Sequence, residues 1–399
     1  MDAGTPAGRA LNQIVKSTDT REVLARAARQ VKDRNLDDYL IVDVDAHHFE
    51  TQSWGEIVAH IPDPVIRDIA ASFRTSGQVT PGIMQATSWP YHQTVAGRIT
   101  HDGGSEEDAR EDGVQRDVVL IRRAMDSMGI DVQVVFPTPM LGLGMHPEVD
   151  VEVALAHGYN RWFIERVLPG DKRIKTLLYL PFNDAEACER FVAEFGAVRG
   201  VVGFMVTSAR QKPVHHNSYM RLYRMLEERG LPLAFHAGPY WGDGFLRQLN
   251  RFLSAHAISF PLGNMVHLAN WVMNGLPERF PKLPIVWSEG GVAWMAFMTQ
   301  RFDNEYLMRS SEAPALKRLP SEYMREMYYT SQPLERTDLG LLEATFHAID
   351  AKNRLLYSSD WPHWDFDLPS TITDLPFLTE HEKRNILGLN AQRLFRLDL

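Results

Sequence analysis

The sequence of 399 residues predicts an α/β protein of the (β/α)8 barrel class. From Asp37 onward, short β-branched or aromatic runs alternate with longer stretches of helical periodicity, which is typical of repeated strand–helix units around a parallel sheet. Three of the short runs, at 41–50, 231–236 and 354–360, end abruptly in side chains that can bind a metal ion. A site shared by the first and last strands requires the sheet to close, which favours a barrel over the alternative of an open doubly wound sheet.

The expected elements follow from this alternation. Strands are expected near 40–45, 131–137, 174–180, 200–206, 231–236, 284–289, 327–331 and 355–360. Helices are expected at 114–128, 151–167, 185–195, 219–229, 292–308, 338–350 and 380–395. The three runs with metal-capable ends are then the first, fifth and eighth strands. In this fold the loops after the carboxyl ends of the strands carry the chemistry, so the three ends are expected at one rim.

Two segments lie outside the strand–helix count. Residues 1–37 are expected to form an N-terminal extension with helical periodicity around 23–31, serving as a packing arm or an oligomer contact. The barrel domain is expected to span 38–399. Within it, residues 72–112 are rich in Gly, Ser, Thr and charge and are too long for a plain connection, so they are expected to form an insertion after the first strand. This insertion could be a lid over the site or a surface excursion.

Composition narrows the possible partners. A hydrophobic content of 44% suits a large buried core, and a net charge of −9 argues against binding to nucleic acid. No window reaches the roughly 18 to 20 apolar residues of a membrane span, and the first 40 residues lack a signal-peptide core, so a cytoplasmic location is expected. Cys188 is the only cysteine, which excludes an intrachain disulfide and a cysteine-based metal cluster. Any metal must be held by His, Asp and Glu.

The first run, Ile41-Val-Asp-Val-Asp-Ala-His-His-Phe-Glu50, carries the most informative motif. Because strand side chains alternate, Asp43, Asp45 and His47 are expected on one face and His48 on the other. Asp45 and His47 can then bind one divalent ion together, since carboxylate oxygen and imidazole nitrogen both ligate zinc and manganese. Polar residues at a strand end without a metal are the structural alternative. His48 is interpreted as structural.

Two further residues complete the predicted ligand set. His236 follows four apolar residues and precedes a sharp exit, whereas Asp360 closes the last strand in Ser-Ser-Asp-Trp-Pro-His. A buried histidine can be hydrogen-bonded structure, and an aspartate before proline can cap a turn. In combination with the first motif, both are interpreted as metal ligands.

Three other residues are candidates at the same rim. Glu289, in Trp-Ser-Glu-Gly-Gly, could be a ligand, a proton carrier or a substrate contact, or could only offset a helix dipole. Glu50 could ligate the ion or orient His47, and His363 could hydrogen-bond a ligand. Either Glu50 or His363 could also be a simple loop residue. Histidines elsewhere, including His256, are interpreted as nonligating.

With these residues, the chain resembles the amidohydrolase superfamily, and within it the group that includes aminocarboxymuconate-semialdehyde decarboxylase and aromatic acid decarboxylases. The resemblance covers roughly 38–396 and rests on Asp45-Ala-His47, His236 and Asp360. It implies one divalent metal ion, usually Zn²⁺ with Mn²⁺ as the alternative, in a distorted barrel that commonly forms homodimers. Decarboxylases of this group usually present a histidine after the sixth strand, where this chain has Glu289.

Three functions are compatible with these observations. We expect first a metal-dependent hydrolase that attacks an amide, ester or lactone of a small, aromatic substrate with a metal-activated water, Asp360 moving the proton and Glu289 assisting. The alternative is a nonoxidative decarboxylase of an aromatic or enoic acid. The third is a noncatalytic binding barrel, which would bind no divalent metal.

Overall fold

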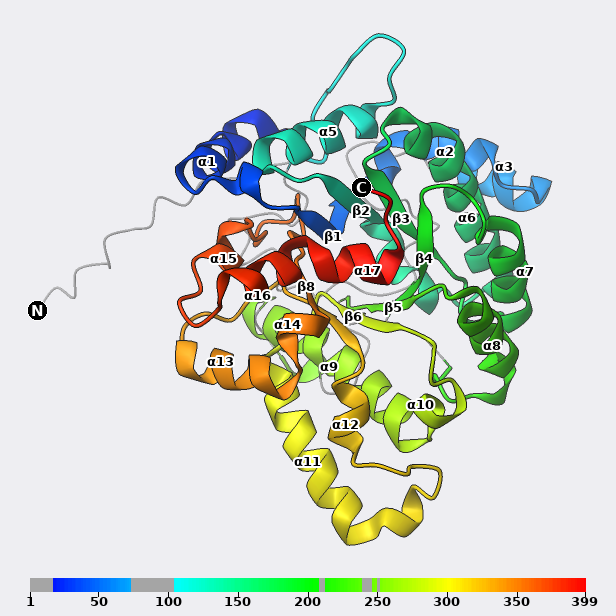
Figure 1. Cartoon of the computed structure of the whole chain (residues 1–399). Coiled ribbons are helices and arrows are strands. Elements are labelled where there is room, and N and C mark those ends of the chain that lie inside the picture. Colours follow the sequence, from blue (N-terminus) through cyan, green and yellow to red (C-terminus); the bar gives the residue numbers. More distant parts are fainter. Residues whose placement is uncertain (1–16, 73–103, 208–211, 239–245, 250–251) are drawn as a thin grey trace, which may run out of the picture.

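The computed structural model describes residues 17–72, 104–207, 212–238, 246–249 and 252–399 (Figure 1). Eight strands form one sheet in the order of the sequence, and each pairs in parallel with the next. The strands are β1 Val42–His48, β2 Val132–Pro137, β3 Ile174–Tyr179, β4 Val201–Thr207, β5 Leu233–His236, β6 Ile285–Ser288, β7 Tyr328–Thr330 and β8 Leu355–Leu356. All eight lie where the sequence predicts strands.

Backbone hydrogen bonds between β1 and the chain that follows β8 join the two ends of the sheet. The amide of Val44 donates to the carbonyl of Tyr357 at 3.0 Å. Further along, the amide of Asp360 donates to Asp45 at 2.7 Å, and that of His47 donates to Trp361 at 2.6 Å. The sheet is therefore a nearly closed barrel, as predicted, and the open doubly wound alternative is wrong.

Helices surround the barrel (Figure 1). Their bounds are α1 Thr20–Asp33, α2 Trp54–Ala59, α3 Pro64–Ser72, α5 Arg116–Met128, α6 Val149–Trp162, α7 Ala185–Phe195, α8 Met220–Arg229, α9 Phe252–Met273, α10 Leu276–Arg279, α11 Ala293–Arg309, α12 Pro320–Met324, α13 Leu339–Ala348, α14 Ala351–Arg354, α15 Ser370–Thr373, α16 Glu380–Arg384 and α17 Asn390–Phe395. The single helix expected at 380–395 is instead α16 and α17 joined by a π-helical turn over Asn385–Leu389. Gly388 in that turn lies so close to β1 that a Cβ would come within 2.2 Å of the Leu40 carbonyl oxygen.

The N-terminal extension contains one described helix, α1, which packs against α5. Leu24, Ala27 and Val31 are its buried apolar positions, in agreement with the helical periodicity of the sequence. The amide of Thr20 at its start donates to Glu107 at 2.9 Å. Glu107 lies in the predicted insertion 72–112, of which residues 73–103 are outside the described residues. The lid interpretation of that insertion stays a prediction.

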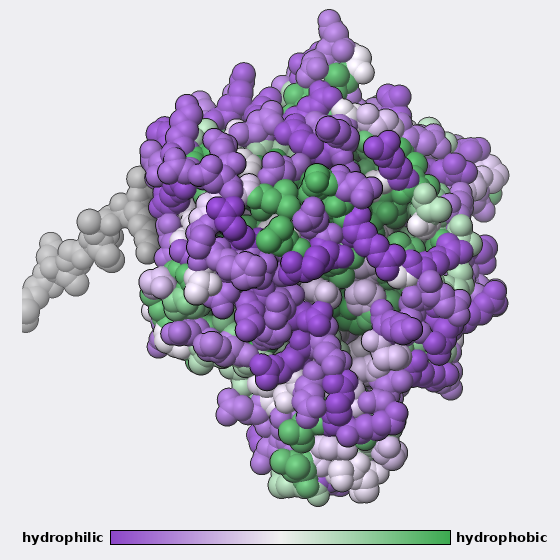
Figure 2. Space-filling model, in the orientation of Figure 1, coloured by the Kyte–Doolittle hydropathy of each residue, from purple (hydrophilic) through white to green (hydrophobic). Residues whose placement is uncertain are grey.

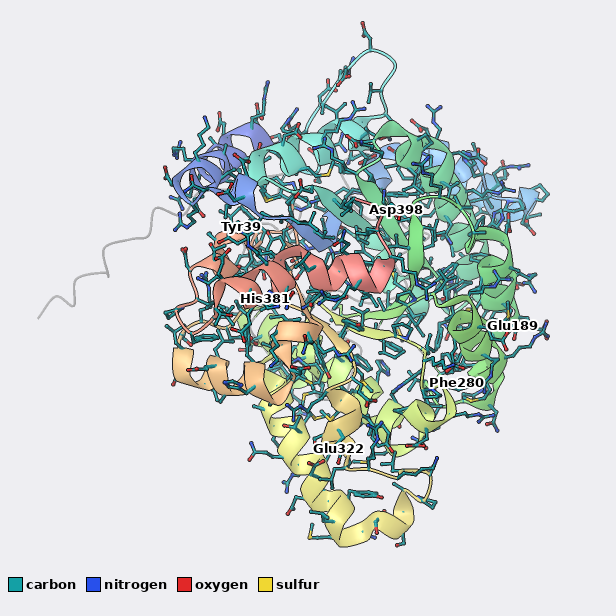
Figure 3. The ribbon with its side chains drawn as sticks, in the orientation of Figure 1. Tyr39, Glu189, Phe280, Glu322, His381 and Asp398 are labelled. Atoms are coloured by element: carbon teal, nitrogen blue, oxygen red, sulfur yellow. The ribbon has the colours of Figure 1, made fainter. Side chains whose placement is uncertain are left out.

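Residues of the C-terminal segment contact the residues that precede β1. The Tyr39 hydroxyl donates to Glu380 of α16 at 2.9 Å, and the guanidinium of Arg384 lies 4.6 Å from the centre of the Tyr39 ring. Figure 3 labels Tyr39 and His381, the residue that follows Glu380. Arg34, just after α1, pairs with Asp374 at 2.7 Å. The segment between α1 and β1 is thus attached to the segment that contains α15 and α16.

The face shown in Figure 2 is mainly hydrophilic, with apolar side chains in scattered patches. One patch lies at the tip of the projection formed by α11, where Leu307 and Met308 are exposed. All positions of β1, β2, β4, β5 and β6 are buried, as expected for parallel strands covered by helices. In the described part of the chain, no helix is long and apolar enough to cross a membrane.

Candidate metal centre

Four predicted ligands meet at the carboxyl ends of β1, β5 and β8. The Nε2 atom of His47 lies 3.3 Å from Asp45 Oδ1 and 3.4 Å from Asp360 Oδ1. The Nε2 atom of His236 lies 3.2 Å from both Asp45 Oδ1 and His47 Nε2. All four side chains are buried. The four predicted ligands therefore meet around His47, which the structure places in two overlapping ligand groups, one with Asp45 and His236 and one with Asp360 and His363. We call Asp45, His47, His236 and Asp360 the cluster.

The hydrogen bonds at Nδ1 of the two histidines determine which ring nitrogen carries the hydrogen. His47 Nδ1 lies 3.0 Å from the Pro137 carbonyl oxygen, and His236 Nδ1 lies 2.7 Å from the Ala237 carbonyl oxygen. A carbonyl oxygen can only accept a hydrogen bond, so each Nδ1 carries the hydrogen and each neutral ring presents a lone pair at Nε2. Burial lowers the pKa of His47 despite its contact with Asp45, which keeps that ring neutral.

These donors fit a divalent cation. The two imidazole lone pairs and the oxygens of Asp45 and Asp360 face one another at 3.2 to 3.4 Å, an arrangement that is repulsive unless positive charge lies among them. Burial disfavours a charged Asp45, whereas positive charge on the adjoining imidazole rings would lower the Asp45 pKa to about 2, so this carboxylate is stabilised by a cation at this point. Its second oxygen, Oδ2, finds no hydrogen-bond partner among the described residues. The cluster is thus built from ligands that zinc and manganese both accept.

A second group of acidic side chains adjoins the cluster. His363 Nδ1 lies 2.7 Å from Asp360 Oδ1 and 3.9 Å from Glu289 Oε1, and Glu289 Oε2 lies 3.2 Å from His236 Nδ1. Burial, together with the charge of neighbouring carboxylates, raises the pKa of both Asp360 and Glu289 well above the ordinary range. This group can therefore keep a proton at pH values where an ordinary carboxyl group has lost it. His363 is placed beside Asp360, as the sequence suggested.

The backbone at both carboxylates is left-handed, with a φ of 59° at Asp360 and 54° at Glu289. This conformation is uncommon for residues other than glycine. It is held at Asp360 by the hydrogen bond from its backbone amide to the Asp45 carbonyl oxygen, and at Glu289 by a 3.0 Å hydrogen bond from its amide to Thr330 Oγ1. Strained backbone of this kind concentrates at functional sites, and here it turns two carboxylates toward the barrel centre.

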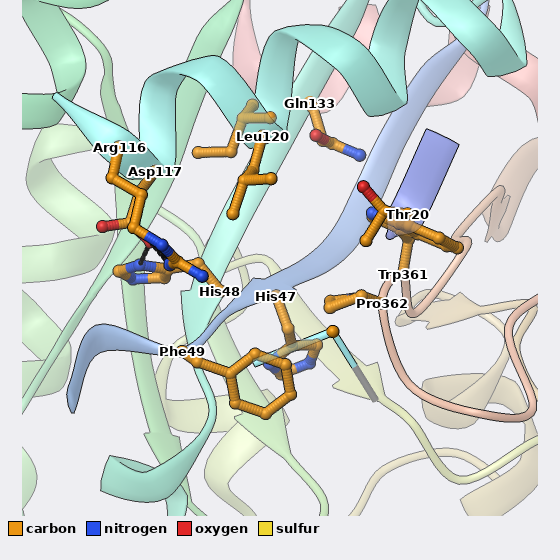
Figure 4. A pocket seen from close by; sticks show the side chains of 12 residues that line it. Thr20, His47, His48, Phe49, Arg116, Asp117, Leu120, Gln133, Trp361 and Pro362 are labelled. Atoms are coloured by element: carbon orange, nitrogen blue, oxygen red, sulfur yellow. Dashed lines mark hydrogen bonds and ion pairs between the residues drawn. The ribbon is translucent and has the colours of Figure 1, made fainter. Parts of the chain in front are cut away.

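Glu50 and His48 lie outside the ligand groups found in the described residues. The Glu50 carboxylate accepts hydrogen bonds from the amides of Thr138 at 3.0 Å and Met140 at 2.8 Å, which holds the loop after β2. Burial raises its pKa to about 7. His48 points away from the cluster, with Nε2 3.0 Å from the Tyr159 hydroxyl and Nδ1 3.4 Å from Asp117 (Figure 4).

A small cavity lies next to the cluster (Figure 4). Its volume is about 30 Å³, and it is lined by residues of α1, β1, α5 and the loop after β8, including His47, Phe49 and Trp361. Space of this size suits one water molecule and is too small for an aromatic ligand. Tyr240 and Trp241, which follow β5 in the sequence, lie outside the described residues.

Sequence reasoning missed the contacts that hold the cluster from behind. Thr138 Oγ1 lies 3.3 Å from His363 Nε2, and Asp43 accepts hydrogen bonds from Ser359 Oγ at 2.6 Å and Gln133 Nε2 at 2.8 Å. The only signal for Thr138 in the sequence was its position just after the second strand. Asp43 lies on the same strand as Asp45, but the strand register is irregular between Asp43 and Ala46, and the two carboxylates contact different side chains.

Comparison with known proteins identifies relatives. The family profile described as Amidohydrolase matches residues 42–397. A gamma-resorcylate decarboxylase from a Polaromonas species is 24% identical over 249 residues, which is 60% of this chain and 75% of the relative.

Solved structures share the fold. A dihydroxybenzoic acid decarboxylase from Polaromonas, with bound manganese and the inhibitor 2-nitroresorcinol, superimposes with a TM-score of 0.63 and 18% identity over 90% of this chain and 97% of that chain. A 5-carboxyvanillate decarboxylase from Sphingomonas paucimobilis gives a TM-score of 0.63 and 18% identity over 90% of this chain and all of that one.

These relatives correct the first functional expectation. The prediction of a hydrolase acting on an amide, ester or lactone is wrong, because the relatives are decarboxylases. The physical reason for the error is that a metal cluster of Asp and His side chains polarises a carboxylate as readily as it activates water. The ligand residues alone therefore did not distinguish the two reactions.

Proposed function

The chain belongs to the Amidohydrolase family, and we propose that it catalyses the nonoxidative decarboxylation of a small hydroxylated aromatic acid. The observation that carries the proposal is the pair of buried ligand groups that share His47, one with Asp45 and His236 and the other with Asp360 and His363, in a chain whose curated relatives include gamma-resorcylate decarboxylases. This was the alternative function compatible with the sequence. A noncatalytic barrel has no need of buried imidazole and carboxylate groups that face one another in this way.

We place one divalent ion on the four clustered side chains. The sequence favoured zinc with manganese as the alternative, and the manganese in a related decarboxylase supports Mn²⁺ here. The chemistry that such an ion supplies when bound is Lewis acidity toward the carboxylate and the adjacent oxygen of the substrate. The Nδ1 hydrogen bonds to the Pro137 and Ala237 carbonyls hold the two histidine rings in the tautomer that ligation requires.

The reaction needs a proton at carbon. When the bond between the ring and the carboxylate breaks, CO₂ leaves, and the electron pair that remains on the ring carbon must take a proton. Asp360 and Glu289 hold that proton in our proposal, because burial raises the pKa of both. The 2.7 Å contact from His363 to Asp360 orients the carboxyl group. The glutamate at the position of the usual histidine can thus serve as a proton carrier.

Metal analysis combined with an activity screen tests the proposal. The purified protein is analysed for bound metal, reconstituted with Mn²⁺ or with Zn²⁺, and supplied with hydroxybenzoic acids while CO₂ release is measured. We expect about one divalent ion per chain and CO₂ release from at least one ortho-hydroxy acid. Metal-loaded protein that releases CO₂ from none of the acids would contradict the proposal. The more active metal decides between manganese and zinc.

A further inference from the structure

A second polar group, formed by Asp365, Gln332 and His256, lies beside the acidic side of the cluster. Asp365 Oδ2 faces His256 Nε2 of α9 at 3.7 Å. Gln332, just after β7, donates from Nε2 to the backbone carbonyl of Asp365 at 3.3 Å. The His256 ring also packs on Trp364, with 5.3 Å between ring centres. Three elements far apart in the sequence therefore build this group.

The loop after β8 folds back so that Asp365 returns to the site. The amide of His363 donates to the Asp360 carbonyl at 2.9 Å, and the amide of Asp367 donates to the Ser359 carbonyl at 2.8 Å. The charge of Asp365 is near enough to contribute to the raised pKa of both Asp360 and Glu289. The polar group thus adjoins the carboxylates to which we assign the proton.

Two acceptor atoms in this group have no hydrogen bond among the described residues. They are Asp365 Oδ1 and Gln332 Oε1, and both atoms are buried. Gln332 is only 1% exposed, so water does not readily satisfy its oxygen. The 3.3 Å bond from Nε2 fixes the amide orientation, because the reverse orientation would bring two oxygens together. Buried polar atoms are nearly always paired, so two unpaired acceptors on residues that contact each other call for an explanation.

We propose that Asp365 and Gln332 form a subsite that binds a second ring hydroxyl of the substrate. This inference rests on the proposed function and narrows its substrate class to aromatic acids with more than one hydroxyl. Gln332 Oε1 can only accept a hydrogen bond, and so can Asp365 Oδ1 in the ionised carboxylate, so the ligand must supply a hydrogen. A phenolic hydroxyl does so, whereas a ring hydrogen does not. His256 holds the other oxygen of Asp365, which leaves Oδ1 for the ligand.

The experiment compares substrates with and without the second hydroxyl. For wild type, Asp365→Leu and Gln332→Met, kcat/KM is measured with 2,3-, 2,4- and 2,6-dihydroxybenzoate and with salicylate, which has one hydroxyl. For each protein, we divide kcat/KM for a dihydroxybenzoate by kcat/KM for salicylate. The second hydroxyl also changes the intrinsic reactivity of the ring, but that effect is the same for every protein and cancels when the ratio for wild type is compared with the ratio for each variant. Resorcinol and phenol binding is measured by calorimetry in parallel, without turnover.

Asp367→Asn is the matched control, since Asp367 lies in the same loop and accepts a 3.1 Å hydrogen bond from the Leu334 amide. For the preferred dihydroxy acid, we expect both subsite variants to reduce the preference over salicylate by about tenfold or more. The Asp367→Asn control should keep the wild-type preference over salicylate. A preference unchanged in both subsite variants overturns the subsite.

The two proposals fail separately. If wild type releases CO₂ from none of these acids, the proposed function fails, and the binding arm still decides the subsite. Wild type that binds resorcinol more tightly than phenol, with this difference lost in the variants, supports the subsite. Equal binding of the two phenols by wild type overturns it.

Discussion

Single side chains determine what the centre of this barrel can hold. His47 and His236 each give their Nδ1 hydrogen to a backbone carbonyl, so two Nε2 lone pairs meet only 3.2 Å apart beside the carboxylate of Asp45. Such an assembly is costly in a buried site without a cation. The raised pKa of Asp360 and Glu289 adds a proton store next to the same atoms. Ligands and acid are thus adjacent because the ends of β1, β5, β6 and β8 converge.

Asp360→Asn tests the proton store. The substitution keeps the size of the side chain but removes a carboxyl group that can carry the proton, so we expect CO₂ release to fall by about 100-fold or more. Because Asn also weakens one metal ligand, metal content and melting temperature are measured alongside, and the rate is compared at equal metal loading. Asp367→Asn in the same loop is the control and should retain activity. An Asp360→Asn protein that is loaded with metal and decarboxylates at the wild-type rate would exclude this role.

Thr138 is expected to position His363 through the 3.3 Å contact with Nε2. Thr138→Val keeps the shape and removes the hydroxyl, so kcat should fall by about tenfold while KM changes little. Thr138→Ser restores the hydroxyl and should restore most of kcat. Steady-state kinetics on both variants give the answer. Equal losses in Val and Ser variants would show that only the packing of Thr138 matters.

For single residues, the sequence predicted the ligands but not the side chains that hydrogen-bond or adjoin them. Asp45, His47, His236 and Asp360 could be recognised because each directly follows an apolar run, and the geometry of parallel strands brings such ends to one rim. The contacts of Thr138 and Asp365 depend on how loops fold over that rim. No local pattern encodes those contacts.

Among the elements, helix α6 and the segment after β3 share a buried polar contact. Glu152 of α6 accepts hydrogen bonds from the Tyr179 hydroxyl at 3.0 Å and from Asn183 Nδ2 at 2.9 Å. Asn183 Nδ2 also donates to the Gly144 carbonyl at 2.7 Å. Burial outweighs these bonds and raises the pKa of Glu152 to about 7. This carboxylate therefore joins α6 to the loops after β2 and β3.

Glu152 gives a prediction for the pH dependence of stability. Its pKa is raised on folding from 4.5 to about 7, so the folded protein binds the proton more tightly than the unfolded chain does. The stabilisation is complete below about pH 4.5 and is lost as pH rises through about 7. Glu152→Gln should remove up to about 3 kcal/mol of this pH dependence. Denaturant unfolding at pH 5 and pH 8 gives the change in the free energy of unfolding between these pH values. An identical change in wild type and variant would refute the assignment.

The elements themselves were largely predictable. Each strand is a short apolar run, and α7 begins and ends where its pattern does. The interruption of the last helix was not predictable, because the turn packs against a distant segment, with Gly388 close to the Leu40 carbonyl oxygen, and no local pattern encodes that contact. Short helices such as α2 and α12 are only five or six residues long, too short for a periodic signal.

For the whole molecule, closure of the barrel makes the site possible. The backbone bonds from β1 to the chain after β8 place Asp45 and Asp360 in direct contact, although 315 positions separate them in the sequence. The sequence predicted this closure from the shared ligand set alone. It did not reveal the attachment of the N-terminal and C-terminal segments by Tyr39, Glu380, Arg34 and Asp374.

Metal removal is expected to destabilise the whole barrel. An ion that binds only the folded cluster stabilises the protein, so chelation should lower the melting temperature by about 5 °C or more. Asp45→Asn lacks one ligand and should show a smaller shift. Differential scanning calorimetry with and without chelator makes the comparison. A wild-type melting temperature that is the same with and without chelator would argue against a bound ion.

A homodimer is expected at the largest scale. Over its 22 residues, α9 contains no Asp, Glu, Lys or Arg, and Leu253, Ile258 and Val266 are exposed. An uncharged helix with exposed apolar positions favours burial against a partner. Light scattering should give twice the chain mass of 45.5 kDa for wild type and a lower mass for Leu253→Glu. A wild-type mass of one chain would disprove the dimer.

The fate of the proton at carbon tests the central claim most directly. Metal-loaded protein is supplied with 2,6-dihydroxybenzoate and other hydroxybenzoic acids in heavy water, and the products are analysed by mass spectrometry and NMR. Our account predicts one CO₂ released per turnover and one deuterium at the ring carbon that carried the carboxylate. Unchanged acids, or products that retain the carboxylate carbon, would contradict it.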